Sequence, residues 1–344
     1  MTSGNWGKVP MGGAEISALN LGEELLKQGH QLQYYLQRCQ PFETANLKVE
    51  LHENVWKDDH EIFICVRPHR ILNPKFRKDE FHLIQKLKII LWSGDAFDQP
   101  SNNIFFDRDT ALSVNTFVFK SNWQRDKILE KFFYIDKSKT KVIYNGFKDS
   151  YFKNLEITHQ KNRFIHTSTW YRGVYNFIRI WPKLLKYIPD AEIHVFSKTS
   201  LYYELNQKDT KWFQIAEELV QLPGMVLREP VPQRILAMEL RKAYLMLYPN
   251  TGFVESSCGS ALQSLAAGTP VIATARAGLP ETVGKAGILI DESEGWEDKF
   301  VEGVVNLCQK PNEREILSEI GLSQVKDQSW TQVAIRWADF LKSL

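Results

Sequence analysis

The sequence predicts an α/β protein made of two doubly wound parallel sheets. Short apolar runs alternate with amphipathic segments along nearly the whole chain, which is typical of buried parallel strands separated by helices. The alternation pauses once, over the polar and turn-rich residues 145–162, and then resumes. The chain has 344 residues, which is enough for two domains of ordinary size.

The first half carries the expected elements in order. Helical spacing covers residues 13–29, because Leu21 and Leu25 fall on one face and Gly29 ends the pattern. A second helix is predicted over residues 123–133. Strands are predicted from apolar or alternating runs at residues 31–36, 62–66, 87–92, 116–119 and 142–144.

The second half repeats the pattern. Strands are predicted at residues 163–167, 192–196, 225–227, 244–247, 271–273 and 288–290. Helices are predicted from residue 174 and over residues 211–220, 234–242, 260–267 and 330–344. Open parallel sheets bind ligands at the carboxyl ends of their strands, so the loops that follow strands are the first place to look for a site.

The composition excludes several classes of protein. Lys and Arg (43) nearly balance Asp and Glu (41), so no basic field is available for binding nucleic acid. The longest apolar runs are far shorter than the roughly 20 residues that a membrane helix needs. The four cysteines are scattered without a CxxC pair, which argues against a zinc site or a disulfide framework and favours a reducing, cytoplasmic location.

Two segments are candidate binding sites. Gly12 and Gly13 directly precede the first helix, where N–H groups can approach a phosphate; the alternative is an ordinary glycine-rich loop. The second segment is a polar loop with one acid, Glu255, followed by a helix rich in small residues. Glu255 and Gln263 are two helical turns apart and can face one ligand. The alternative is that small residues only permit tight packing and Glu255 is solvated.

The second segment resembles the signature of the retaining glycosyltransferases of GT-B fold, the glycosyl transferases group 1 (family 4-like) type. The nucleotide-sugar motif of that family is an E-x7-E loop and helix followed by A-x-G-T-P-V and G-x-P-E. Here it reads Glu255 to Gln263, then residues 266–271 and 278–281. Further pieces in the family's order are GGAE at residues 12–15, LLKQGH at 25–30, VIYNGF at 142–147, Arg172-Gly173, and LYPN at 247–250.

The resemblance implies two Rossmann-like domains that face each other across a cleft. It places an N-terminal, acceptor-side domain at residues 1–145 and a nucleotide-sugar-binding domain at residues 146–328. Residues 329–344 would form a helix that packs back on the first domain. Residues 1–11 look loop-like, so we expect the first strand of the first domain to be missing from this chain.

The resemblance also implies roles for individual residues. Gly12 and Gly13 offer N–H groups to the donor diphosphate, and Arg172 supplies a cation for it, unless Arg172 is only a solvated loop charge. Glu255 binds donor-sugar hydroxyls and stabilises the transition state. The other implied donor contacts are Ser257, Cys258, Gly259 and Ser260 at the sugar and phosphates, and Gln263 at the ribose.

The implied function is a retaining glycosyltransferase that moves a sugar from a UDP- or GDP-sugar to a saccharide, lipid or small-molecule acceptor. Transfer would need no cofactor and no metal, because Arg172, backbone amides and a helix dipole meet the charge on the leaving group. The alternative is a catalytically degenerate GT-B protein that binds nucleotide-sugar or polysaccharide without turnover.

Three positions depart from the family pattern. Gln263 stands in place of the second acid, and Gly94 stands where the family has a His near the end of a first-domain strand. His166 or Thr167 falls where the family has an Arg, and Lys198 is a candidate replacement cation. Gln263 and Gly94 favour the degenerate alternative, whereas the retained Glu and Arg favour the enzyme.

Acceptor contacts are expected on loops of the first domain. Asp95 and His69 are the candidates, and the alternatives are a turn acid and a solvated loop histidine. The basic, aromatic stretch 67–81 is a candidate for peripheral contact with a membrane face or a lipid-linked acceptor. A solvated loop is the alternative for that stretch.

Overall fold

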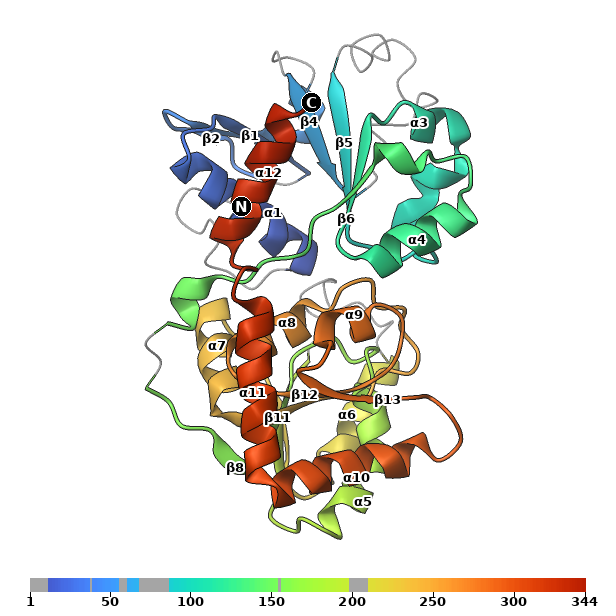
Figure 1. Cartoon of the computed structure of the whole chain (residues 1–344), viewed down its shortest axis with the longest axis vertical. Coiled ribbons are helices and arrows are strands. Elements are labelled where there is room, and N and C mark those ends of the chain that lie inside the picture. The colour runs from blue at the N-terminus through green and yellow to red at the C-terminus, as the bar shows by residue number, and fades with distance from the viewer. Residues whose placement is uncertain (1–11, 38, 56–60, 68–86, 154–155, 198–209) are drawn as a thin grey trace. The chain divides into compact units, whose positions relative to one another are not determined.

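The computed structural model describes residues 12–37, 39–55, 61–67, 87–153, 156–197 and 210–344. These residues divide into two compact units (Figure 1). Unit 1 holds Gly13–Gly146 and Trp330–Leu344, and unit 2 holds Phe147–Ser329 with Gly12.

Unit 1 begins with helix α1 (Gly13–Lys27) and a small sheet of three strands. The helix buries Leu21 and Leu25 on one face, as its spacing predicts. The sheet has the order β1-β3-β2, in which β1 and β3 are parallel and β2 is antiparallel to β3. The strands are β1 (Leu32–Leu36), β2 (Phe42–Glu43) and β3 (Leu47–Leu51).

A four-stranded parallel sheet forms the centre of unit 1. Its order is β4-β5-β6-β7. The strands are β4 (Ile62–Val66), β5 (Lys88–Ser93), β6 (Thr116–Phe119) and β7 (Thr140–Val142), and the helices between them are α3 (Arg108–Leu112) and α4 (Asn122–Lys131). In β5 the residues from Ile89 to Trp92 are at most 2% exposed. A continuous apolar run is typical of such a strand, because helices or loops cover both faces.

The C-terminal helix α12 (Trp330–Lys342) packs against α1 and the four-stranded sheet. The ring of Trp337 meets that of Trp92 edge to face with centroids 5.1 Å apart, and Trp330 lies 6.5 Å from the same ring. All three rings are buried. Their burial holds helix α12 against the rest of unit 1.

Unit 2 is built on a six-stranded, wholly parallel sheet with the order β10-β9-β8-β11-β12-β13. The strands are β8 (Gln160–His166), β9 (Glu192–Phe196), β10 (Met225–Arg228), β11 (Ala243–Tyr248), β12 (Val271–Thr274) and β13 (Gly287–Ile290). The helices are α5 (Phe177–Leu185), α6 (Thr210–Leu219), α7 (Gln233–Lys242), α8 (Gly259–Ala266), α9 (Leu279–Val283), α10 (Trp296–Gln309) and α11 (Pro311–Val325). The strand order reverses between β8 and β11, which is where a doubly wound sheet binds its ligand.

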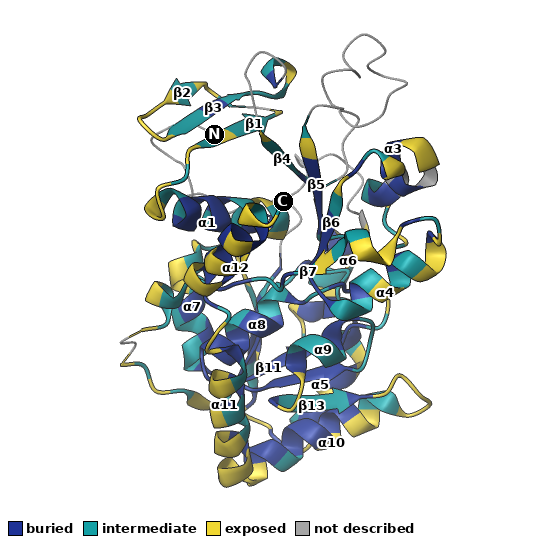
Figure 2. Ribbon diagram, turned by 45° about the horizontal axis from the view of Figure 1, so that its top comes forward, coloured by how far each residue is buried: buried dark blue, intermediate teal, exposed yellow. Residues whose placement is uncertain are grey.

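The two faces of β11 pack into separate hydrophobic cores. Leu245 and Leu247 join the core under α5 and α10, and Met246 and Tyr248 join the core under α8. Figure 2 shows the centre of unit 2 mostly coloured as buried. The strand is therefore rigid, and the loop that follows it starts from a fixed point.

The apolar runs predicted as strands are all strands, with ends that differ by a few residues. The largest differences are at β8, which starts at Gln160 rather than at residue 163, and at β7, which lies at Thr140–Val142 rather than at residues 142–144. The helix expected from residue 174 starts as a 3₁₀ turn, Val174–Asn176, before α5. Among the described residues, the strands and α-helices for which there was no prediction are β2, β3, α3, α9, α10 and α11.

Some predictions fall outside the described residues. They concern the missing strand at residues 1–11, the acceptor candidate His69, the cation Lys198 and most of the stretch 67–81. Within the described part of the chain, no helix has the length and apolar character needed to cross a membrane. All four cysteines are free thiols.

Candidate functional site

The candidate site of unit 2 lies at the carboxyl ends of β8 and β11. β8 ends at His166 and its parallel neighbour β11 ends at Tyr248. The loop after β8 carries Arg172, and the loop after β11 carries Glu255. Sheet topology therefore brings together two residues that are far apart in the sequence.

Glu255 is a buried acid with two side-chain partners. It is 3% exposed. The Nη1 atom of Arg172 lies 3.2 Å from its Oε2 and 3.4 Å from its Oε1. The hydroxyl of Tyr248 donates to Oε2 over 3.0 Å. The carboxylate is thus enclosed by polar partners rather than solvated, and its role in sugar binding stays a prediction.

The backbone around Glu255 is supported by the segment that begins at Gly278. The Gly278 N–H donates to the Glu255 carbonyl over 2.7 Å, and a Cβ on Gly278 would lie 2.3 Å from the Ser256 carbonyl oxygen. The Thr282 hydroxyl accepts from the Cys258 N–H over 3.3 Å. The Gly-Leu-Pro-Glu stretch therefore shapes the acidic loop.

Arg172 sits in a tight turn against the loop that follows β11. The next residue, Gly173, has a φ of +100°, and a Cβ there would lie 2.4 Å from the Pro249 carbonyl oxygen. The guanidinium lies 4.4 Å over the Phe253 ring, a cation–π geometry. The Arg172 side chain is 26% exposed, against 4% for Glu255, so Arg172 is the more accessible member of the pair.

His166 and Tyr248 form a buried stack beside Glu255, with ring centroids 5.1 Å apart and planes 18° from parallel. His166 Nδ1 donates to the Leu247 carbonyl over 2.9 Å, so Nε2 is the bare nitrogen of the neutral ring. Burial lowers the pKa of His166 to about 4 and raises the pKa of Tyr248 well above 10. At His166 and Thr167, the two positions that the resemblance sets against the family's Arg, this chain has uncharged side chains.

The depressed pKa of His166 predicts a pH dependence of stability. The ring takes a proton near pH 6.5 when unfolded but only near pH 4 when folded. The unfolded chain therefore binds more protons in this window, and the free energy of unfolding falls as the pH drops from 6.5 to 4, by about 3 kcal/mol from this residue.

Chemical denaturation at several pH values measures this effect. We expect the stability of His166→Phe, which keeps a ring in the stack, to fall less steeply than that of the wild type between pH 6.5 and 4. Equal slopes for the two proteins would contradict the assignment.

The other implied donor contacts gather at the start of α8. The Cys258 sulfur caps this helix by accepting the Ala261 N–H over 3.4 Å, and burial raises the pKa of the thiol to about 12, so it stays protonated. The Ser260 hydroxyl donates to the Thr167 carbonyl. The remaining three, all half-buried, are Ser257, Gly259 and Gln263. Their binding roles stay predictions.

Four buried polar atoms near the ends of β8 and β9 have no hydrogen-bond partner among the described residues. They are His166 Nε2, Thr167 Oγ1, Thr169 Oγ1 and Ser197 Oγ. Unpaired buried groups of this kind are rare and are candidates for contact with a ligand or water. Sequence reasoning missed Thr169 and Ser197, because a single hydroxyl after a strand carries no signal of its own.

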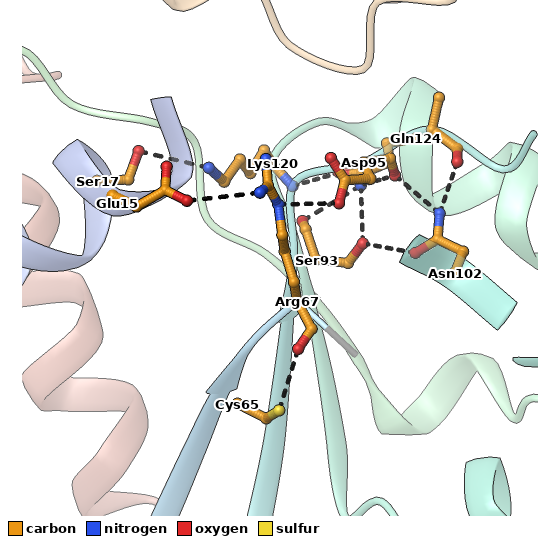
Figure 3. A network of polar contacts seen from close by, with 10 residues as sticks. Glu15, Ser17, Cys65, Arg67, Ser93, Asp95, Asn102, Lys120 and Gln124 are labelled. Atoms are coloured by element: carbon orange, nitrogen blue, oxygen red, sulfur yellow. Dashed lines mark hydrogen bonds and ion pairs between the residues drawn. The ribbon is translucent and has the colours of Figure 1, made fainter. Parts of the chain in front are cut away.

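Unit 1 has its own polar network at the carboxyl ends of β4 and β5 (Figure 3). Arg67 lies between two acids, with its Nε 3.2 Å from Asp95 and its Nη1 3.5 Å from Glu15. The φ of Arg67 is +68°, which is unusual for a residue other than glycine. Asp95 is therefore an ion-paired residue, and its contact with an acceptor stays a prediction.

Lys120 occupies the space beside Gly94, where the family has a His. A Cβ on Gly94 would lie 2.9 Å from Lys120 Nζ. That ammonium lies 3.4 Å from Ser17 Oγ and 5.2 Å from the centre of the Trp92 ring. The sequence alone indicates that Gly94 stands in place of the family's histidine. Only the fold shows that the Lys120 side chain lies beside Gly94.

Gly12 and Gly13 stand at the start of α1, as predicted from the sequence. Gly12 is buried, and Gly13 is exposed and is the first residue of the helix. A Cβ on Gly13 would meet nothing within 4 Å. The space beside Gly13 is open, and phosphate binding by the two glycines stays a prediction.

Comparison with known proteins was made by sequence and by structure. Residues 162–310 match the family model described as glycosyl transferases group 1. A stretch of 170 residues is 26% identical to D-inositol 3-phosphate glycosyltransferase of Corynebacterium kroppenstedtii. That match covers 49% of this chain and 37% of the other protein, so the chain spans little more than a third of this relative.

Solved structures share the fold along nearly the whole chain. HepE of Anabaena, in complex with UDP-glucose, has a TM-score of 0.75 at 14% identity and covers 98% of this chain and 97% of that one. A glycosyltransferase of Rickettsia africae has a TM-score of 0.74 at 13% identity, covering 96% and 95%. Sucrose-phosphate synthase of Thermosynechococcus elongatus has a TM-score of 0.72 at 14% identity, covering 99% and 97%.

These similarities show the GT-B fold and confirm the predicted α/β class. Residues 162–310, which lie within unit 2 and include Arg172 and Glu255, resemble the glycosyl transferases group 1 family.

Proposed function

We propose that this protein is a retaining glycosyltransferase that moves a sugar from a UDP- or GDP-sugar to a saccharide, lipid or small-molecule acceptor. The observation that carries the proposal is the pairing of Arg172 with the buried Glu255 at the carboxyl edge of the sheet. It places a guanidinium suited to a diphosphate beside a carboxylate suited to sugar hydroxyls. The similar HepE structure contains UDP-glucose.

In the proposed reaction, an acceptor hydroxyl attacks the anomeric carbon on the face from which the diphosphate leaves. A new C–O bond forms, the bond from the anomeric carbon to the phosphate oxygen breaks, and the hydroxyl proton passes to the diphosphate. Arg172 and the N-terminal N–H groups of α8 meet the charge on the leaving group. Glu255 binds sugar hydroxyls and stabilises the positive charge that develops on the ring.

We propose that transfer needs neither a metal nor a cofactor. Among the described residues, no group of three or more His, Cys, Asp or Glu side chains is arranged to hold a metal ion. In this proposal Arg172 takes the charge-neutralising part that a metal has in other transferases. Peripheral contact with a membrane and a cytoplasmic location stay predictions.

A second candidate function is binding of a nucleotide-sugar or polysaccharide without turnover. Gln263 and the neutral His166 favour it, because each removes a charge from the family's donor site. The buried and ion-paired Glu255 favours the enzyme, because an acid held at this place can stabilise the transition state as well as bind the sugar.

The test is an assay of nucleoside diphosphate release and product formation over a panel of UDP- and GDP-sugars, with EDTA present. We expect turnover of at least one donor and a product with the donor's anomeric configuration, read by NMR. Binding without any release would support the second candidate instead. An inverted product would contradict the retaining mechanism.

A further inference from the structure

Arg172 and Glu255 are partners of each other in this structure, although the proposed function gives each a different ligand. Arg172 is to meet the diphosphate, and Glu255 is to meet the sugar. Because the Arg172 side chain is the more exposed of the two, an arriving diphosphate meets it first. The diphosphate then competes with the carboxylate for the positive charge of Arg172.

Tyr248 is the second side-chain partner of Glu255, and an arriving diphosphate does not compete for its hydroxyl. It is the last residue of β11 and is fully buried. Its hydroxyl oxygen lies 3.0 Å from Glu255 Oε2 and 3.3 Å from Ser168 Oγ. A carboxylate only accepts, so the single phenolic hydrogen goes to Glu255 and the serine hydroxyl can donate to the Tyr248 oxygen.

The ring of Tyr248 is held in place by its surroundings. It stacks on His166, whose Nδ1 is anchored to the Leu247 carbonyl and whose ring meets Phe177 edge to face at 5.7 Å. Burial raises the pKa of the Tyr248 phenol, so its O–H remains a donor at physiological pH. The hydrogen bond to Glu255 therefore does not depend on a ligand.

We infer that Tyr248 is a positioning residue of the proposed transferase, which keeps the Glu255 carboxylate in place when Arg172 engages the donor diphosphate. The inference rests on the proposed function. A buried carboxylate that loses its cation is costly, and a hydrogen bond from a neutral donor stabilises its ionised form. Tyr248 supplies that bond, while Gly278 holds the backbone of Glu255.

Tyr248→Phe tests the inference, because it removes the hydroxyl and keeps the stacked ring. We expect kcat to fall about 10- to 100-fold, the range for one hydrogen bond to a charged group. The KM for the donor should stay close to that of the wild type, because Tyr248 acts through Glu255.

Tyr244→Phe is the matched control. Tyr244 lies on the same strand and is 3% exposed, but its hydroxyl donates to the Leu307 carbonyl over 3.4 Å. It should keep the kcat and the donor KM of the wild type. Equal effects of the two variants on kcat, or a Tyr248→Phe enzyme with the kcat of the wild type, would overturn the inference.

Calorimetric titration with UDP or GDP, whichever the wild type binds, separates positioning from loss of structure. Tyr248→Phe should bind that nucleotide as the wild type does. A parallel loss of nucleotide affinity and kcat would show a merely structural role and would also overturn the inference. Absence of transfer by the wild type would instead overturn the proposed function.

Discussion

Glu255→Gln is expected to lower kcat for sugar transfer about 100- to 1,000-fold, the cost of removing one group that stabilises a charged transition state. The substitution keeps the size of the side chain and removes its charge. The Glu255 carboxylate is buried against Arg172 and Tyr248. Neither solvent nor a solvated acid can therefore replace it in the variant. Affinity for the nucleoside diphosphate should be retained, because Arg172 is then free of its competing acid.

Steady-state kinetics and calorimetry on the same preparation measure both effects. The matched control is Glu239→Gln, which also removes a partly buried, ion-paired glutamate of unit 2, here the partner of Arg163. The control should keep its kcat within about twofold, since surface and structural ion pairs act mainly on stability. If Glu255→Gln turned over at the wild-type rate, Glu255 would have no catalytic role.

Gly173→Ala is expected to lower the free energy of unfolding by about 2–4 kcal/mol, the sum of backbone strain and overpacking. The φ of Gly173 is +100°, and an added Cβ would lie 2.4 Å from a carbonyl oxygen and 2.8 Å from the Asn250 nitrogen. These are backbone atoms of the loop that leads to Glu255, so they cannot move aside as a flexible side chain can. Transfer activity should fall as well, because the turn positions Arg172.

Gly295→Ala separates backbone strain from overpacking, the two causes of the loss of stability expected for Gly173→Ala. Gly295 also has a positive φ, +74°, but a Cβ there would meet nothing within 4 Å. Gly295→Ala should therefore lower the free energy of unfolding only by the backbone strain, about 1–2 kcal/mol. Urea unfolding of both variants gives the comparison. Equal losses of stability in the two variants would mean that the close approach of Gly173 to the loop after β11 does not contribute to the effect of Gly173→Ala.

The fold was predictable because its signals are local. Most strands of the two large sheets contain a short apolar run, such as Ile89 to Trp92, and the runs are separated by helical spacing. The strand β7, which reads Thr-Lys-Val, is an exception. The helix α10 was missed although Phe300, Val304 and Cys308 recur at helical spacing and are buried. The pairing of β2 with β3 was missed because β2 has only two residues, too few to show a pattern.

The candidate site was predictable only in part, because its contacts depend on strand order. Arg172 and Glu255 carry motifs, and so they could be named before the structure. Tyr248 lies in a motif too, but its hydrogen bond to Glu255 follows from the path of the loop between them. Lys120 carries no motif, and its place beside Gly94 follows from the pairing of β5 with β6.

The central claim is that the carboxyl edge of the unit 2 sheet binds a nucleoside diphosphate through Arg172. Calorimetric titration of UDP and of GDP into the wild type and Arg172→Met tests it most directly. Arg179→Met, which breaks the ion pair with Glu297 on α10, is the control. The account predicts that one nucleotide binds the wild type and the control equally and Arg172→Met at least about tenfold more weakly. Equal affinity for all three proteins, or no binding of either nucleotide to the wild type, would contradict it.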